Sequence, residues 1–263
     1  MSDPQHGSPT PNQTALIRVE LNLPDGPLRG QVEVDTGPMR LADLVPTAYE
    51  LTMALSGRAN RHEEQAGRPI SCRAGCAACC RQLVPLSPPE AFYLVGMIDA
   101  IHPDRKRTYL ARFEQIDARL EAEGMIEELF NPTVTDDPVL EVSRRYFNMA
   151  MACPFLEDEC CSIHPVRPVA CREYNVTSPA TWCSDPYNHP IQKVPMPLPL
   201  SLPLTLLTNE LLGRRFPLIP LTLAPRWVRE NAAFGERTWP GLELFRQFIS
   251  RFKQGPPADG RLR

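Results

Sequence analysis

Cysteine thiols are the side chains of this chain with the clearest potential for chemistry. Four stand within nine residues and four follow in a second, wider group, in this order: Cys72, Cys76, Cys79, Cys80, Cys153, Cys161, Cys171 and Cys183. Thiolates bind soft and borderline metal ions, and short spacings let one loop direct two or three sulfurs at one centre. The spacing therefore predicts a metal site assembled from two loops.

Disulfide bonds are the alternative use of so many thiols. The chain has nine cysteines, an odd number that leaves at least one thiol unpaired. Residues 1–14 are polar and lack the apolar core of a signal peptide. The longest apolar stretch, 195–207, is interrupted by prolines and is too short to span a bilayer. We therefore expect a cytoplasmic protein, whose thiols are kept reduced and are free to bind metal.

The net charge of -3 over 263 residues bears on the choice of partner. A chain so close to neutrality gives no electrostatic case for nucleic acid or for an anionic membrane surface, so neither is expected as a partner. The expected partner is a metal ion or cluster, and a protein partner stays open.

The residues before the first cysteine group indicate a β-hairpin and then a helix. Apolar side chains alternate through residues 17–23, a Pro-Asp-Gly-Pro turn follows at 24–27, and the alternation returns at 32–34. Apolar positions then take helical spacing, and Pro46 marks the start of the helix. Residues 1–14 have almost no apolar side chains and are expected to be a disordered tail.

Three helices are predicted between the two cysteine groups. Residues 87–98 open with Ser-Pro-Pro-Glu, the sequence of a capping box with prolines in the first helical turn. Apolar spacing predicts the other two helices at about 104–123 and 137–149. Because these helices separate Cys80 from Cys153, the site must close a loop of about 70 residues, which a scaffold of packed helices can do.

Proline dominates the later part of the chain. Eleven of the thirty prolines lie between Pro179 and Pro240, so we expect extended, packed chain there, with a short helix near 204–212. A final helix is predicted at 241–253. Its stripe of apolar side chains is expected to pack in the core rather than to bind a partner, and comprises Leu242, Phe245, Phe248, Ile249 and Phe252.

The predicted fold class is mainly α: an irregular helical metal-binding domain with a short N-terminal β-hairpin and a proline-rich C-terminal segment. We divide the chain into a disordered tail (1–14), an N-terminal hairpin and helix (15–68), a cysteine-cluster metal-binding domain (69–185), and a proline-rich wrapping segment with a C-terminal helix (186–263).

The two cysteine groups together resemble a known family. The first group ends in Cys79-Cys80, and the second opens with Cys-Pro-Phe-Leu at Cys153 and closes with Arg-Pro-x-x-Cys-Arg at Cys171. This combination, over about residues 70–185, is similar to the YkgJ family of cysteine-cluster proteins, a zinc- or iron-chelating domain. The resemblance implies metal ligands at Cys72, Cys76, Cys79, Cys80, Cys153, Cys161, Cys171 and Cys183. A related cluster occurs in the flagellin lysine methylase.

Two further side chains and four arginines accompany the predicted ligands. His164 stands where such proteins commonly have Tyr, and is expected to have a packing or surface role rather than to be a ligand. Cys160 is taken as the spare thiol. Arginines flank the ligands and either balance thiolate charge or lie on the surface, at Arg73, Arg81, Arg167 and Arg172.

The identity of the metal is not fixed by the ligand type. Structural zinc sites favour two short C-x2-C pairs, whereas the second group here is widely spaced and adjacent cysteines occur twice. This irregular spacing favours an iron–sulfur cluster or iron, with zinc as the alternative. One centre and two centres both remain open.

We expect a metal-binding protein with an accessory or redox role, rather than an enzyme. A structural zinc module that acts as a protein-interaction scaffold is the first alternative. A cluster-dependent enzyme, such as a methylase or a radical S-adenosylmethionine enzyme, is the second, since Cys72-x3-Cys76-x2-Cys79 has the radical-enzyme spacing. A thiol oxidoreductase would need a βαβ context around its cysteine pair, and the sequence does not predict one. The chain also contains no Gly-x-Gly, so nothing indicates a nucleotide-binding loop.

Overall fold

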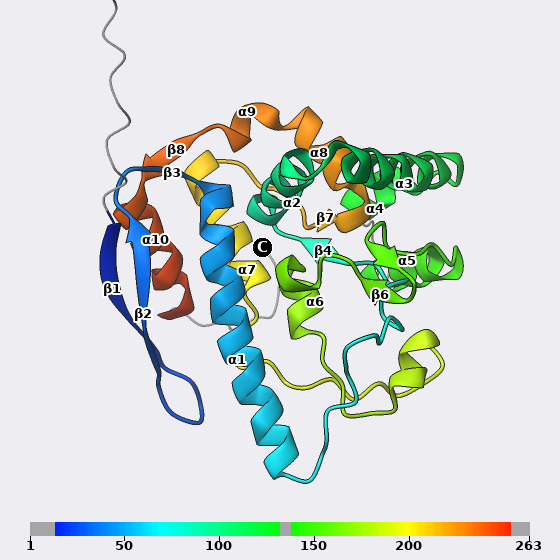
Figure 1. Cartoon of the computed structure of the whole chain (residues 1–263), viewed down its shortest axis with the longest axis horizontal. Coiled ribbons are helices and arrows are strands. Elements are labelled where there is room, and N and C mark those ends of the chain that lie inside the picture. The colour runs from blue at the N-terminus through cyan, green and yellow to red at the C-terminus, as the bar shows by residue number, and fades with distance from the viewer. Residues whose placement is uncertain (1–13, 132–137, 254–263) are drawn as a thin grey trace, which may run out of the picture.

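The computed structural model describes residues 14–131 and 138–253. Within them the chain is mainly helical, with a hairpin at one side, which confirms the predicted fold class (Figure 1). The helices are α1 (Val45–Gln65), α2 (Pro88–Ala100), α3 (Pro103–Ala122), α4 (Ile126–Phe130), α5 (Pro138–Asn148), α6 (Val169–Glu173), α7 (Ser201–Leu212), α8 (Ala224–Glu230), α9 (Ala232–Gly235) and α10 (Gly241–Ser250). The predicted tail lies outside the described residues, apart from Thr14.

The strands are short and pair two by two among the described residues. They are β1 (Thr14–Leu21), β2 (Leu28–Asp35), β3 (Pro38–Arg40), β4 (Pro85–Leu86), β5 (Leu156–Glu157), β6 (Cys160–Cys161), β7 (Ile219–Pro220) and β8 (Thr238–Pro240). Every pair is antiparallel: β1 with β2, β3 with β8, β4 with β7, and β5 with β6. Single 3-10 turns occur at 41–44, 164–166, 180–184, 221–223 and 251–253.

The predicted N-terminal hairpin is confirmed. Strands β1 and β2 pair from Thr14 opposite Asp35 to Leu21 opposite Leu28. Val19, Leu21 and Val34 are buried against the rest of the molecule, as the alternation of apolar residues requires for a sheet with one covered face.

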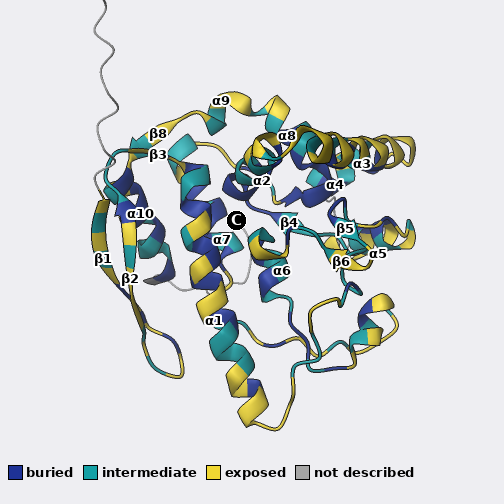
Figure 2. Ribbon diagram, in the orientation of Figure 1, coloured by how far each residue is buried: buried dark blue, intermediate teal, exposed yellow. Residues whose placement is uncertain are grey.

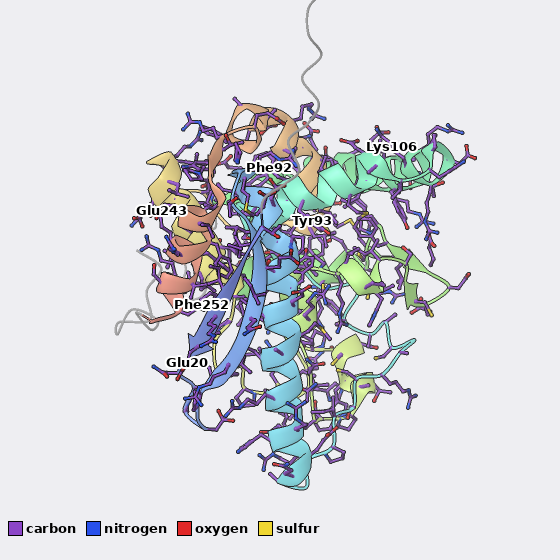
Figure 3. All side chains as sticks on the ribbon, turned by 60° about the vertical axis from the view of Figure 1, so that its left-hand side comes forward. Glu20, Phe92, Tyr93, Lys106, Glu243 and Phe252 are labelled. Atoms are coloured by element: carbon purple, nitrogen blue, oxygen red, sulfur yellow. The ribbon has the colours of Figure 1, made fainter. Side chains whose placement is uncertain are left out.

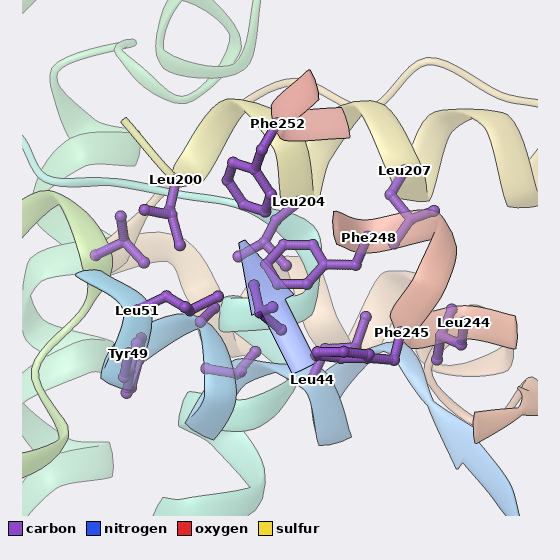
Figure 4. Packing of buried hydrophobic residues seen from close by; sticks show 14 of the residues in the cluster. Leu44, Tyr49, Leu51, Leu200, Leu204, Leu207, Leu244, Phe245, Phe248 and Phe252 are labelled. Carbon is purple, nitrogen blue, oxygen red and sulfur yellow. The ribbon is translucent and has the colours of Figure 1, made fainter. Parts of the chain in front are cut away.

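One apolar core joins the two ends of the described chain. Leu44 and Leu55 from the start of the chain share a cluster with Leu204 of α7 and with Phe245 and Phe248 of α10 (Figure 4). The apolar stripe of the final helix therefore packs in the core, as predicted. Segments separated by about 150 to 200 residues of sequence are held together here by burial of apolar surface.

Helix α2 links this core to a second one. Its Tyr93 packs edge-on against Tyr49 of α1, with ring centroids 5.7 Å apart, while Phe92 packs against Trp227 of α8 at 5.2 Å (Figure 3). The second core also takes in Tyr109 and Phe113 of α3. Figure 2 shows buried positions concentrated where α1, α2, α6 and α7 converge, with exposed positions along the outer face of α3.

Some helices are longer than predicted or were not predicted, and prolines lie in the first turns of two of them. Helix α7 confirms the short helix predicted near 204–212, whereas α4, α6, α8 and α9 were not predicted. Pro203 and Pro225 lie in the first turns of α7 and α8, where a missing N–H costs no intrahelical hydrogen bond. The proline-rich segment is therefore less extended than expected. Helix α1 runs from Val45 to Gln65, within the segment assigned to the hairpin and helix.

In the part of the chain that the structure describes, no helix has the length and apolar character needed to cross a membrane.

Candidate metal centre

The first cysteine loop is a succession of tight turns. The amide of Cys76 donates to the carbonyl of Arg73 at 3.0 Å, and that of Cys80 donates to Ala77 at 2.9 Å. Gly75 has φ +79, a left-handed conformation that glycine adopts without the penalty a side chain would bring. The turns fold the loop on itself, so the four thiols project from a short, compact stretch of backbone.

The second cysteine group is attached to the end of this loop. The amide of Cys153 donates to the carbonyl of Cys80 at 2.8 Å. Nearby, the guanidinium of Arg81 makes a forked pair with Glu159 at 2.7 and 3.2 Å, in the turn of the β5–β6 hairpin. The loop of about 70 residues predicted between the groups is thus closed by a direct backbone hydrogen bond.

The chain around Cys183 is attached to both ends of the first loop. The amide of Ser71 donates to the carbonyl of Val176 at 2.9 Å, and the side-chain amide of Gln82 donates to the carbonyl of Cys183 at 3.2 Å. Two segments that are far apart in sequence, 153–159 and 176–183, therefore converge on residues 71–82.

Helix α6, which carries Cys171, is fixed by buried polar contacts. Glu90 of α2 is fully buried and accepts hydrogen bonds from the amides of Ser87 and Val169 at 2.9 and 2.8 Å, and from the Ser87 hydroxyl at 2.8 Å. The guanidinium of Arg172 lies 4.4 Å from the ring centroid of Tyr49, a cation–π contact with α1. Cys171 is thereby held against the long helices.

Burial makes these thiols hard to ionise while no cation is bound. It raises the pKa of Cys153 to about 12 and that of Cys183 to about 11, and raises the pKa of Cys171 well above its ordinary value. A hydrogen bond with Cys80, followed by burial, raises the pKa of Cys79. Negative charge on neighbouring thiolates adds to each of these increases, so a bound metal ion would replace protons and relieve mutual repulsion.

Arg167 is the cation that opposes this effect. Its charge works to lower the pKa of four thiols, against their burial, namely Cys72, Cys79, Cys161 and Cys171. The Nε of Arg167 is buried and has no hydrogen-bond partner among the described residues. Of the four flanking arginines, Arg167 thus fits the charge-balancing role, whereas Arg81 pairs with a carboxylate and Arg73 is exposed.

All nine cysteines of the chain are free thiols in the structure. Cys183 is buried, Cys160 is exposed, and the other seven are half-buried. Within the described ranges, no three His, Cys, Asp or Glu side chains are arranged so as to close around one metal ion. The thiol donors suit a thiophilic metal in their chemistry, whereas their present arrangement does not form a coordination shell; they would have to rotate about their side-chain bonds to complete one.

His164 and Cys160 lie at the border of this cluster. His164 is exposed, and partial burial together with the charges of Arg167 and Arg172 lowers its pKa. A Cβ built on Gly75 would lie 4.0 Å from the sulfur of Cys160, so the spare thiol sits over the first loop.

Three supporting side chains were missed in the sequence. Glu90 was read only as part of a capping box, and nothing local indicates its bond to Val169. Tyr174 and Gln82 lie beside Cys183, and burial raises the pKa of Tyr174 to about 12. The closeness of Gln82 and Tyr174 to cysteines in the sequence was the signal that could have identified these two residues.

These features describe a cysteine-rich segment whose thiol donors suit a thiophilic metal. A family model, CxxCxxCC, described as a putative zinc- or iron-chelating domain, matches residues 71–187. The matched segment is similar to this family and coincides with the resemblance found in the sequence, which it confirms. No curated protein and no solved structure matches the chain.

Proposed function

We propose that this protein binds an iron–sulfur cluster or iron through thiolates from both cysteine groups and has an accessory or redox role. The single observation that carries the proposal is the 2.8 Å hydrogen bond from Cys153 to Cys80, because it brings two cysteine groups together across the helices between them. The candidate ligands are the eight predicted thiols, with Cys160 as the spare.

The protein's own contribution is to hold the thiols and balance their charge. Helix α6 presents Cys171 from a position fixed by Glu90, and Arg167 supplies positive charge where thiolates accumulate. When bound, the group would supply one-electron chemistry if it contains iron, or would crosslink the loops if it is zinc.

The zinc-scaffold alternative is favoured by the loops that converge on the site. Residues 66–84 and 174–200 contain little regular structure, and a structural metal would stabilise both of them. The radical-enzyme alternative is disfavoured, because the strands of the described residues form two-stranded antiparallel pairs rather than a strand–helix barrel.

Anaerobic purification followed by iron, zinc and acid-labile sulfide analysis tests the proposal. Brown protein with iron and sulfide supports it, while colourless protein with stoichiometric zinc supports the scaffold. Cys79→Ser and Cys161→Ser should each lose metal, and Cys160→Ser is the matched control that should retain it. Full metal retention in all three variants would refute the proposed ligands.

A further inference from the structure

The N-terminal hairpin has a free edge, which is the outer side of β1. Strand β1 pairs with β2 in continuous register along all eight of its residues, and it contains no proline. In an antiparallel pair, alternate residues of each strand direct their amide and carbonyl away from the partner strand. Among the described residues, no backbone hydrogen bond from outside the hairpin reaches β1, and Figure 1 shows this strand on the outer side of the hairpin. The edge is therefore open to pairing with another strand.

The two faces of β1 differ in the kind of side chain that they carry. Val19 and Leu21 point toward the core and are buried, whereas Arg18 and Glu20 lie on the opposite face and are exposed. Glu20 is paired with Arg29 on the neighbouring strand, at 3.1 Å. Arg18 stands opposite a neutral residue of β2 and has no ion-pair partner in the part of the chain that the structure describes. The outer face of β1 thus carries one paired and one unpaired charge, of opposite sign.

We propose that β1 pairs antiparallel with β1 of a second copy of this chain, about a two-fold axis at Val19. Residues directly opposite each other in a sheet lie on the same face, so symmetric pairing about Val19 places Arg18 opposite Glu20 of the second copy. Symmetry repeats this ion pair on the other side of the axis. On the core face, Ile17 comes opposite Leu21 of the second copy. The edge is therefore complementary to itself in both charge and polarity.

The neighbouring registers lack this complementarity. A pair centred on Arg18 would place two guanidinium groups opposite each other and Leu16 opposite Glu20. A pair centred on Glu20 would place two carboxylates opposite each other, and like charges in that position destabilise a sheet. A pair centred on Ile17 would leave both charges opposite neutral residues. The charges of β1 therefore select the register about Val19.

The resulting four-stranded sheet gives the exposed side chains of β1 new neighbours. Glu20 would lie between Arg29 of its own chain and Arg18 of the second copy. Leu16, which at 64% is the most exposed of the large apolar side chains in the described ranges, would come opposite Asn22 of the second copy. An interface of two strands is small, so we expect association that depends on concentration rather than a permanent dimer.

The test is sedimentation velocity of the full chain in reducing buffer, from low to high micromolar concentration. The unmodified chain should shift from monomer to dimer. Arg18→Glu and Glu20→Arg each place like charges opposite each other and should weaken association about tenfold. Arg119→Glu makes the same change of charge on the exposed face of α3 and is the control that should associate normally. Circular dichroism checks that each variant keeps its helices.

An equimolar mixture of Arg18→Glu and Glu20→Arg tests the register itself. In a mixed dimer every charge at these two positions again faces its opposite, so the mixture should associate as the unmodified chain does. Hydrogen exchange of the unmodified chain should also slow over residues 15–21 as its concentration rises. A chain that stays monomeric, variants that associate as tightly as the control, a mixture that is no better than its components, or unchanged exchange over these residues would overturn the proposal. None of these outcomes bears on metal binding.

Discussion

Glu90 offers the sharpest test of how the fold supports the site. Its carboxylate is fully buried at the start of α2 and accepts from two backbone amides, those of Ser87 and Val169, and from the Ser87 hydroxyl. Val169 begins α6, two residues before Cys171. Glu90 thus connects the capping of α2 to the placement of a predicted ligand 81 positions later in the chain.

The magnitude follows from the donors left behind. Glu90→Ala leaves two buried amides without an acceptor, and each unsatisfied buried donor costs about 1–3 kcal/mol, so we expect a loss of about 4 kcal/mol in the free energy of unfolding. Glu90→Gln keeps one acceptor oxygen, which serves either the Ser87 side or Val169, but not both. It should therefore cost about 2 kcal/mol.

Urea denaturation followed by circular dichroism at pH 7, with metal content measured on the same samples, checks this order. We expect unmodified protein, Glu90→Gln and Glu90→Ala to decrease in stability in that sequence, with metal retention falling in parallel. Equal midpoints for the two variants, or a loss below about 1 kcal/mol for Glu90→Ala, would show that the carboxylate does not organise α6.

Three further predictions concern packing, charge and pH. Gly241→Ala should lower the free energy of unfolding by about 3 kcal/mol, since its Cβ would lie 2.0 Å from the carbonyl oxygen of the last residue of β2. The control Gly96→Ala, whose Cβ would have no atom within 4 Å, should raise the free energy of unfolding by about 0.5–1 kcal/mol; urea denaturation measures both. Arg167→Gln should raise the pH midpoint of zinc binding by roughly one unit, because the lost guanidinium charge favours thiolates. Arg167→Lys keeps a positive charge and should show a smaller shift. An unchanged midpoint in Arg167→Gln contradicts the charge-balancing role. The hydrogen bond from Arg68 lowers the pKa of Glu63 below 4.5, so the pair stabilises the fold above pH 4.5 and loses this effect as the pH falls through the lowered pKa. The difference in urea midpoint between Arg68→Ala and the unmodified protein should therefore vanish in acid. A difference that stays constant with pH would contradict this prediction.

Much of the fold could be predicted because its signals are local. Prolines and a capping box mark where α1, α2 and α3 begin, and alternation marks the hairpin. Helices α8 and α9 have no such pattern of their own. Their positions depend on tertiary contacts such as that of Trp227 with Phe92, and a sequence does not reveal which distant ring will be the partner.

The site was predictable in its residue types and not in its arrangement. Spacing and the resemblance picked out the eight thiols, and their role as ligands stays a prediction. The contacts that gather them, such as Ser71 with Val176 and Cys153 with Cys80, join residues 73 or more positions apart. Pairings at such separations are decided by how the helices pack, which no local pattern encodes.

The shared core of the chain's two ends has a consequence for biosynthesis. A ribosome extends the chain from its N-terminus, and α10 emerges long after the thiols between residues 72 and 183. Leu44 and Leu55 therefore lack their core partners Phe245 and Phe248 until α10 has been synthesised. The core that encloses Leu44 and Leu55 is thus completed only after every thiol of the candidate site has been synthesised.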